Sequence, residues 1–150
     1  MDRGLKAAEL FVGGHNCAQA VAVAFCDVTG LDEAFSCRMA SSFGGGMGRM
    51  REVCGAVSGM LMVAGLLYGY DVIGDDAVKK AHYALVQELA GQFRQEVGSI
   101  VCREILKNPP SDPEPSPRTE EYYRVRPCAC MVLTAANILD AYIKEHPPKR

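Results

Sequence analysis

The sequence predicts an all-α fold, a compact single-domain helical bundle that covers residues 1–150. Apolar residues recur at helical spacing along most of the chain, and no segment shows the apolar–polar alternation of a strand. Hydrophobic residues make up 49% of the chain and charged residues 23%, which is an ordinary globular balance. A chain of this length can bury a sizeable core without disulfides.

The N-terminal half is predicted to form three helices and a glycine-rich turn. The first helix covers residues 5–12 and ends at a glycine pair. A second helix begins after Asn16, a good N-cap residue, and reaches about residue 28. A third covers residues 31–40, and "SSFGGGMGR" at 41–49 reads as a flexible or tightly turned loop.

An apolar helix is predicted next, over residues 53–68. Residues 53–70 carry no charge over 18 positions, which is the lower edge of a membrane span. Five of these residues are Gly or Ser, however, and no other segment comes close to spanning. We therefore expect a buried central helix rather than a membrane helix.

The C-terminal half is predicted to contain three more helices and a proline-rich connection. Asp75 can cap a long amphipathic helix that reaches about residue 96. The segment "NPPSDPEPSPRTEE" is too rich in proline for a helix and is expected to cross the surface. The remaining segments are a short helix at 100–106, the surface connection at 109–121, a last helix from Pro127 to about 144 and a tail at 146–150.

Charge and cysteine content restrict the function. The formal net charge is -2 and no basic cluster stands out, so nucleic-acid binding is not expected. The N-terminus is charged and lacks the apolar run of a secretory signal, which predicts a cytoplasmic protein. Seven cysteines in a reducing compartment then favour metal binding or redox chemistry over structural disulfides.

Four cysteines lie at, or next to, predicted helix starts. They are Cys17, Cys54, Cys102 and Cys128. Free backbone N–H groups and the helix dipole favour a thiolate there, and Arg51, Arg103 and Arg126 lie close by in the sequence.

Two glycines follow one of these cysteines and leave a bare helix face beside it. Gly55 and Gly59, after Cys54, would let either a cofactor or another helix approach closely.

Several motifs together resemble the C_GCAxxG_C_C family of redox-active proteins, which is named for four cysteines and a CGAxxG motif. They are "NCAQAV" at 16–21, "FGGGMGR" at 43–49, "CGAVSG" at 54–59, "SIVCREIL" at 99–106 and a late cysteine before "AANIL". The resemblance extends from Leu5 to about Tyr142.

The resemblance implies that the family's four cysteines correspond to Cys17, Cys54, Cys102 and either Cys128 or Cys130. We prefer Cys128, because Val132 and Ala135 then follow at helical spacing. It further implies a link to membrane transporters and a similarity to split-Soret cytochromes, which are associated with an iron–sulfur centre. Haem is not implied, since the chain has no CxxCH motif.

Three interpretations of the four-cysteine site stay open. The first is an electron-transfer protein that binds an iron–sulfur cluster of the [2Fe–2S] type, with Gly55 and Gly59 making room. The second is an oxidoreductase with reversible cysteine pairs. The third is a Zn²⁺-binding or metal-carrying module. The redox partner is unknown, and the long apolar helix suggests a homodimer.

Overall fold

The structure, a computed structural model, describes residues 1–149, apart from the side chain of Val125. It confirms the prediction of an all-α protein, and no strand occurs in this part of the chain. The helices are α1 (Arg3–Val12), α2 (Cys17–Ala24), α3 (Cys26–Thr29), α4 (Glu33–Ala40), the 3₁₀-helix η1 (Ser41–Phe43), α5 (Gly44–Met47), α6 (Gly55–Tyr68), α7 (Asp76–Val97), α8 (Cys102–Ile105), α9 (Glu120–Val125) and α10 (Cys128–Glu145).

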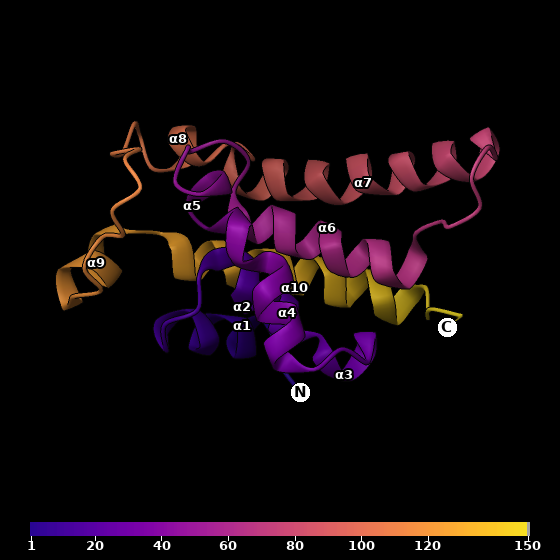
Figure 1. Cartoon of the computed structure of the whole chain (residues 1–150), viewed down its shortest axis with the longest axis horizontal. Helices are drawn as coiled ribbons and strands as arrows, with labels where there is room; N and C mark the ends of the chain where they lie inside the picture. The colour runs from indigo at the N-terminus through magenta and orange to yellow at the C-terminus, as the bar shows by residue number, and fades with distance from the viewer. Residues whose placement is uncertain (150) are drawn as a thin grey trace.

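Helix α6 lies at the centre of the bundle, with α7 along one side and α1, α2 and α10 on the other (Figure 1). Its residues Val57, Met60 and Val63 are almost completely buried, as expected for a central helix. The core continues through Phe11, Phe25, Leu89, Phe93, Val132 and Leu139. Within residues 1–149, no helix combines the length and the apolarity that crossing a bilayer would need.

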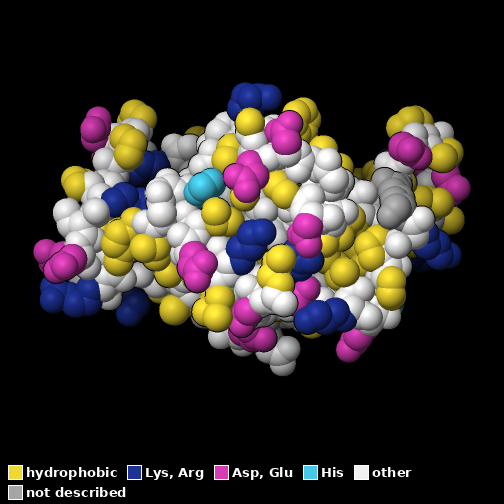
Figure 2. Space-filling view, turned by 90° about the horizontal axis from the view of Figure 1, so that it is seen from below, with side chains coloured by type: hydrophobic (Ala, Val, Ile, Leu, Met, Phe, Trp, Pro, Cys, Tyr) yellow, Lys and Arg dark blue, Asp and Glu magenta, His cyan; other side chains and the backbone are white. Residues whose placement is uncertain are grey.

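The outer surface mixes charges of both signs. On the face drawn in Figure 2, Lys and Arg side chains alternate with Asp and Glu, and hydrophobic side chains lie between them. Among the described residues, four cationic side chains form five ion pairs, two of which join Arg3 to Asp27 and Asp140.

Two predicted elements differ from the structure. The helix expected over 16–28 breaks at Phe25, because the Ala24 carbonyl accepts a hydrogen bond from the Arg3 Nη1 at 3.0 Å. The connection expected over 109–121 ends two residues early, because Thr119 caps α9 by accepting from the Tyr122 amide at 3.2 Å. The tail after Glu145 is not helical up to residue 149, and residue 150 lies outside the described residues.

Helices α2 and α6 cross in close contact at Gly59. A Cβ added there would lie 2.6 Å from the Ala18 carbonyl oxygen and 3.1 Å from the Val21 Cβ. The backbone atoms of α2 therefore occupy the space that any side chain at position 59 would need. Helix packing explains this glycine, and its position gives no support to cofactor binding.

Replacing Gly59 with alanine is expected to lower the free energy of unfolding by about 2 kcal/mol, because the new methyl group would force α2 and α6 apart. Gly65→Ala is the matched control in the same helix, since a Cβ there meets no atom within 4 Å. That control should raise stability by up to about 1 kcal/mol through helix propensity. Urea denaturation measures both, and equal stability of the two variants would contradict the close packing.

Candidate functional site

A short antiparallel pairing brings Cys54 and Cys102 together. The Cys54 amide donates to the Ile100 carbonyl at 2.7 Å, and the Cys102 amide donates to the Glu52 carbonyl at 2.6 Å. Val53 and Val101 form the bridge between these hydrogen bonds. The helices predicted to begin at 53 and 100 therefore begin two residues later, at Gly55 and Cys102.

Cys17 and Cys128 are the first residues of α2 and α10. Asn16 fixes the start of α2 through a capping box with Gln19, in which each side chain bonds the other residue's backbone amide. The two thiols influence each other's ionisation, with Cys17 favoured as the proton-bearing thiol and Cys128 as the thiolate. All four predicted cysteines thus begin a helix or directly precede one.

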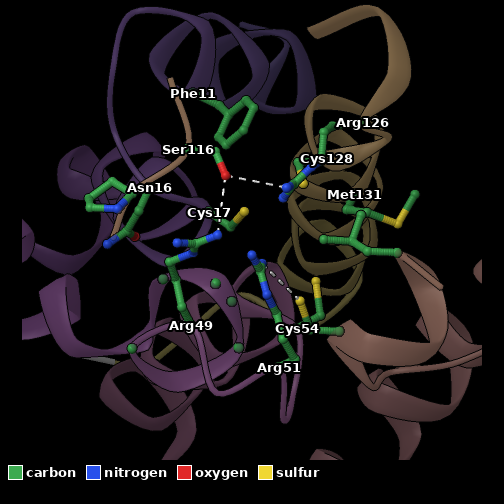
Figure 3. Close-up of a pocket in the computed structure, with 18 of the residues that line it drawn as sticks. Phe11, Asn16, Cys17, Arg49, Arg51, Cys54, Ser116, Arg126, Cys128 and Met131 are labelled. Atoms are coloured by element: carbon green, nitrogen blue, oxygen red, sulfur yellow. Dashed lines mark hydrogen bonds between the residues drawn. The ribbon is translucent and has the colours of Figure 1, made fainter. Parts of the chain in front are cut away.

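The four cysteines line one pocket of about 420 Å³ (Figure 3). Its other walls are the glycine-rich loop, the proline-rich segment and the first turn of α10. Figure 3 shows Arg51 and Cys54 on one side of this space, with Cys17, Arg126 and Cys128 opposite them. Cys130, the alternative fourth cysteine, is exposed and does not line the pocket.

The four thiols of the pocket differ in pKa, and burial is the main cause for two of them. Burial raises the pKa of Cys54 to about 12 and also raises the pKa of Cys102. The neighbouring Cys128 sulfur, and then burial, raise the pKa of Cys17. Cys128 is the exception, with a pKa lowered to about 7 by the hydrogen bond from Cys17 and then by nearby arginines. The expectation that all four helix starts favour thiolates is therefore wrong for three of them.

Arginines supply the charge of the pocket. Arg49, Arg51, Arg118 and Arg126 line it, and no acidic side chain does so among the described residues. Only Arg49 has a carboxylate partner in that part of the chain, Asp112 at 3.5 Å. Arg103, expected to act on the thiols, instead forms an exposed ion pair with Glu52.

Arg51 is the most deeply placed of the four, with 4% of its surface exposed. Its Nε donates to the Pro110 carbonyl at 2.9 Å, and its Nη1 lies 3.8 Å from the Cys102 sulfur. The buried Nη2 has no hydrogen-bond partner among the described residues. A buried guanidinium with an unused donor is costly unless a further group pairs with it.

The proline-rich segment covers the pocket and is held there by arginines. Besides Arg51, Arg49 donates to the Asp112 carbonyl at 3.1 Å and to the Ser116 hydroxyl at 3.2 Å. Arg118, within the segment, donates back to the carbonyls of Phe11 and His15. The predicted surface connection is thus a wall of the site.

The glycine-rich loop forms the floor beside Cys102. Gly45, Gly46 and Gly48 have φ values of 66°, 72° and 59°, in the left-handed region that favours glycine. A Cβ at Gly46 would lie 2.7 Å from the Cys102 Cβ. Gly55 lines the pocket next to Cys17, and a Cβ added to Gly55 would lie 3.0 Å from the Cys17 Cβ, whereas Gly59 does not line the pocket.

Sequence reasoning missed Arg49, Arg118 and Ser116. The two arginines stand in "GGGMGR" and "PSPRTEE", segments that looked like a turn and a linker. An arginine flanked by glycine or proline in a chain with clustered cysteines is the signal that could have drawn attention to them.

The donor set suits a metal cluster chemically, since thiolates bind iron and zinc and the arginines would balance an anionic cluster. Within residues 1–149, however, no three His, Cys, Asp or Glu side chains are gathered closely enough to hold a metal ion. All seven cysteines are free thiols.

Comparison with known proteins identifies the family. Residues 15–142 match the family described as "Putative redox-active protein (C_GCAxxG_C_C)", a range that includes all four cysteines of the pocket. No curated protein and no solved structure shows a significant match to the chain. The match covers well over half of the sequence, and the chain therefore belongs to the C_GCAxxG_C_C family of redox-active proteins.

Proposed function

We propose that the protein is a thiol–disulfide oxidoreductase in which Cys17 and Cys128 form the reversible pair. The observation that carries the proposal is that these two thiols, at the starts of α2 and α10, line the same pocket and each has the largest effect on the other's pKa. Cys128 is the nucleophile, because its thiolate is favoured by the Cys17 thiol and by Arg126. Cys17 is the resolving residue, because it retains its proton until Cys128 has reacted.

The reaction is a two-step exchange with a small disulfide. The Cys128 thiolate attacks one sulfur of the disulfide, the S–S bond breaks, and the first half leaves as a thiolate that takes a proton from solvent. Cys17 then gives its proton to solvent and attacks the Cys128 sulfur, which breaks the mixed S–S bond and releases the second half as a thiolate that takes up a proton. The substrate disulfide gains two electrons, and the Cys17–Cys128 pair loses two.

This proposal is tested by oxidising the reduced protein with one equivalent of bis(2-hydroxyethyl) disulfide under argon. We expect the loss of two protein thiols, release of two molecules of 2-mercaptoethanol, and a peptide map in which Cys17 is linked to Cys128. Cys128→Ser should form no internal disulfide, whereas the matched variant Cys130→Ser should behave as the unaltered protein. A bridge between Cys128 and Cys130 instead, or a persistent mixed disulfide, would contradict the assignment.

An iron–sulfur cluster held by Cys17, Cys54, Cys102 and Cys128 is the second candidate. It is supported by the convergence of four thiols and four arginines on one pocket, and a bound cluster would supply one-electron transfer. Anaerobic purification followed by iron, sulfide and zinc analysis tests it. Stoichiometric iron and sulfide, lost in Cys54→Ser, would favour the cluster. A metal-free protein would favour the thiol pair, and zinc alone would favour a structural metal site.

A further inference from the structure

We propose that the pocket selects anionic low-molecular-weight disulfides, whose carboxylate or other acidic group binds Arg51 beside the reactive thiols. This inference rests on the proposed thiol–disulfide function and adds the class of substrate. It is carried by a buried, incompletely paired arginine and by the charge of the pocket wall.

One nitrogen of the Arg51 guanidinium is left without an acceptor in the described part of the chain. Its Nε donates to the Pro110 carbonyl at 2.9 Å, and its Nη1 lies 3.8 Å from the Cys102 sulfur, a weak acceptor. The Nη2 is buried and has no partner in the described part of the chain. An anionic oxygen of a ligand would complete this guanidinium with a charge-assisted hydrogen bond, which a neutral or cationic ligand would not supply.

The surrounding charge favours the same ligand. Four arginines line the pocket without an acidic side chain among the described residues, and only Arg49 is paired with a carboxylate. Arg118 and Arg126 instead use the carbonyls of Phe11 and His15, the Ser116 hydroxyl and aromatic faces. A single thiolate offsets only one of these charges, so the pocket keeps a positive excess that attracts anions.

The position and size of the pocket fit a substrate rather than a bare ion. Arg51 lies near Cys102 and acts electrostatically on Cys128, so an acidic group bound to it stays close to the thiols. A volume of about 420 Å³ exceeds the need of one inorganic anion. It suits a ligand of about a dozen non-hydrogen atoms, with an apolar stem beside Met131, Ile105 and Leu106.

The test compares three disulfides of similar shape and different charge. These are the dianion 3,3′-dithiodipropionate, the neutral bis(2-hydroxyethyl) disulfide and the dication cystamine. The rate at which each oxidises the reduced full-length protein is measured at constant low ionic strength. A free thiolate such as 2-mercaptoethanol reacts faster with the dication, because unlike charges attract. We expect the protein to reverse this order and to react fastest with the dianion.

Charge-removing variants connect the preference to the pocket. Arg51→Gln should reduce the ratio of dianion to dication rates about tenfold or more, as expected for loss of a charge-assisted hydrogen bond. Arg126→Gln should reduce it less. Arg94→Gln is the matched control, because Arg94 is exposed on α7 and does not line the pocket. Suberate, the all-carbon analogue of dithiodipropionate, should bind the reduced protein in calorimetry and inhibit its oxidation competitively.

The outcomes distinguish failure of the anion site from failure of the proposed thiol–disulfide function. If the protein prefers the dication as a free thiolate does, or if Arg51→Gln and Arg94→Gln keep the same ratio, the anion site is refuted while the thiol pair stands. If no disulfide oxidises the Cys17–Cys128 pair, the proposed function is wrong, and suberate binding alone decides the anion site. Should Arg51→Gln fail to fold, Arg126→Gln and suberate binding to the unaltered protein decide the question.

Discussion

Replacing Gly46 with alanine is expected to lower the free energy of unfolding by about 3 kcal/mol and to disrupt the thiol pocket. Two effects add at this position. The φ of 72° is unfavourable for a residue with a Cβ, and that Cβ would lie 2.7 Å from the Cys102 Cβ and 2.8 Å from the Glu52 nitrogen. The new methyl group would therefore push the paired segment at 52–54 and 100–102 out of place. Chemical denaturation and thiol titration measure the two consequences.

Gly48→Ala is the control for the Gly46 substitution. Gly48 lies in the same loop with a φ of 59°, but a Cβ there meets only the Ser42 carbonyl oxygen, at 3.9 Å. This variant should lose only the conformational contribution, about 1 kcal/mol, and keep its thiol reactivity. Equal losses in the two variants would mean that the close contact with Cys102 is unimportant.

Replacing Cys17 with alanine is expected to raise the pKa of Cys128 above its value of about 7, toward that of an ordinary thiol. The hydrogen bond from Cys17 is the largest cause of the lowered value, so its removal favours the protonated thiol. Because only the thiolate is alkylated, the rate with iodoacetamide rises with pH and levels off above the pKa. The midpoint of that profile, recorded in a Cys130→Ser background, should therefore move to higher pH.

Cys17→Ser provides the matched comparison, because a hydroxyl group can still donate to the Cys128 sulfur. Its profile should keep a midpoint closer to about 7 than that of Cys17→Ala. Identical profiles in both variants and the unaltered protein would show that the arginines alone favour the thiolate, and the pairing of Cys17 with Cys128 would lose its support.

Local signals in the sequence were sufficient to predict the helical bundle and the residues at which its main helices begin. Asn16, Asp75 and Pro127 stand at helix beginnings where expected, and the apolar run after Cys54 forms the central helix. The placement of the four cysteines at helix beginnings followed from the same signals. These features depend on residues a few positions apart, which periodicity and capping rules describe well.

The interior of the site depended on contacts between distant segments, and the sequence did not reveal these. The pairing of Val53 with Val101 joins two short segments that each looked like a helix start. The depth of burial, which raises the pKa of Cys54 and Cys102, is a property of the folded chain as a whole. The roles of Arg49 and Arg118 depend equally on where the proline-rich segment crosses the bundle. That the protein forms a homodimer stays a prediction.

The way in which the proline-rich segment is attached has a consequence for mutational tolerance. Arg51 and Arg49 hold it chiefly by the carbonyl oxygens of Pro110 and Asp112, and every residue type presents a carbonyl. Exposed side chains of the segment, such as that of Glu114, make no contact on which this attachment depends. Apart from Asp112, Ser116 and Arg118, whose side chains also attach it, the segment can therefore accept many substitutions while still covering the pocket. The arginines that hold it cannot be exchanged so freely.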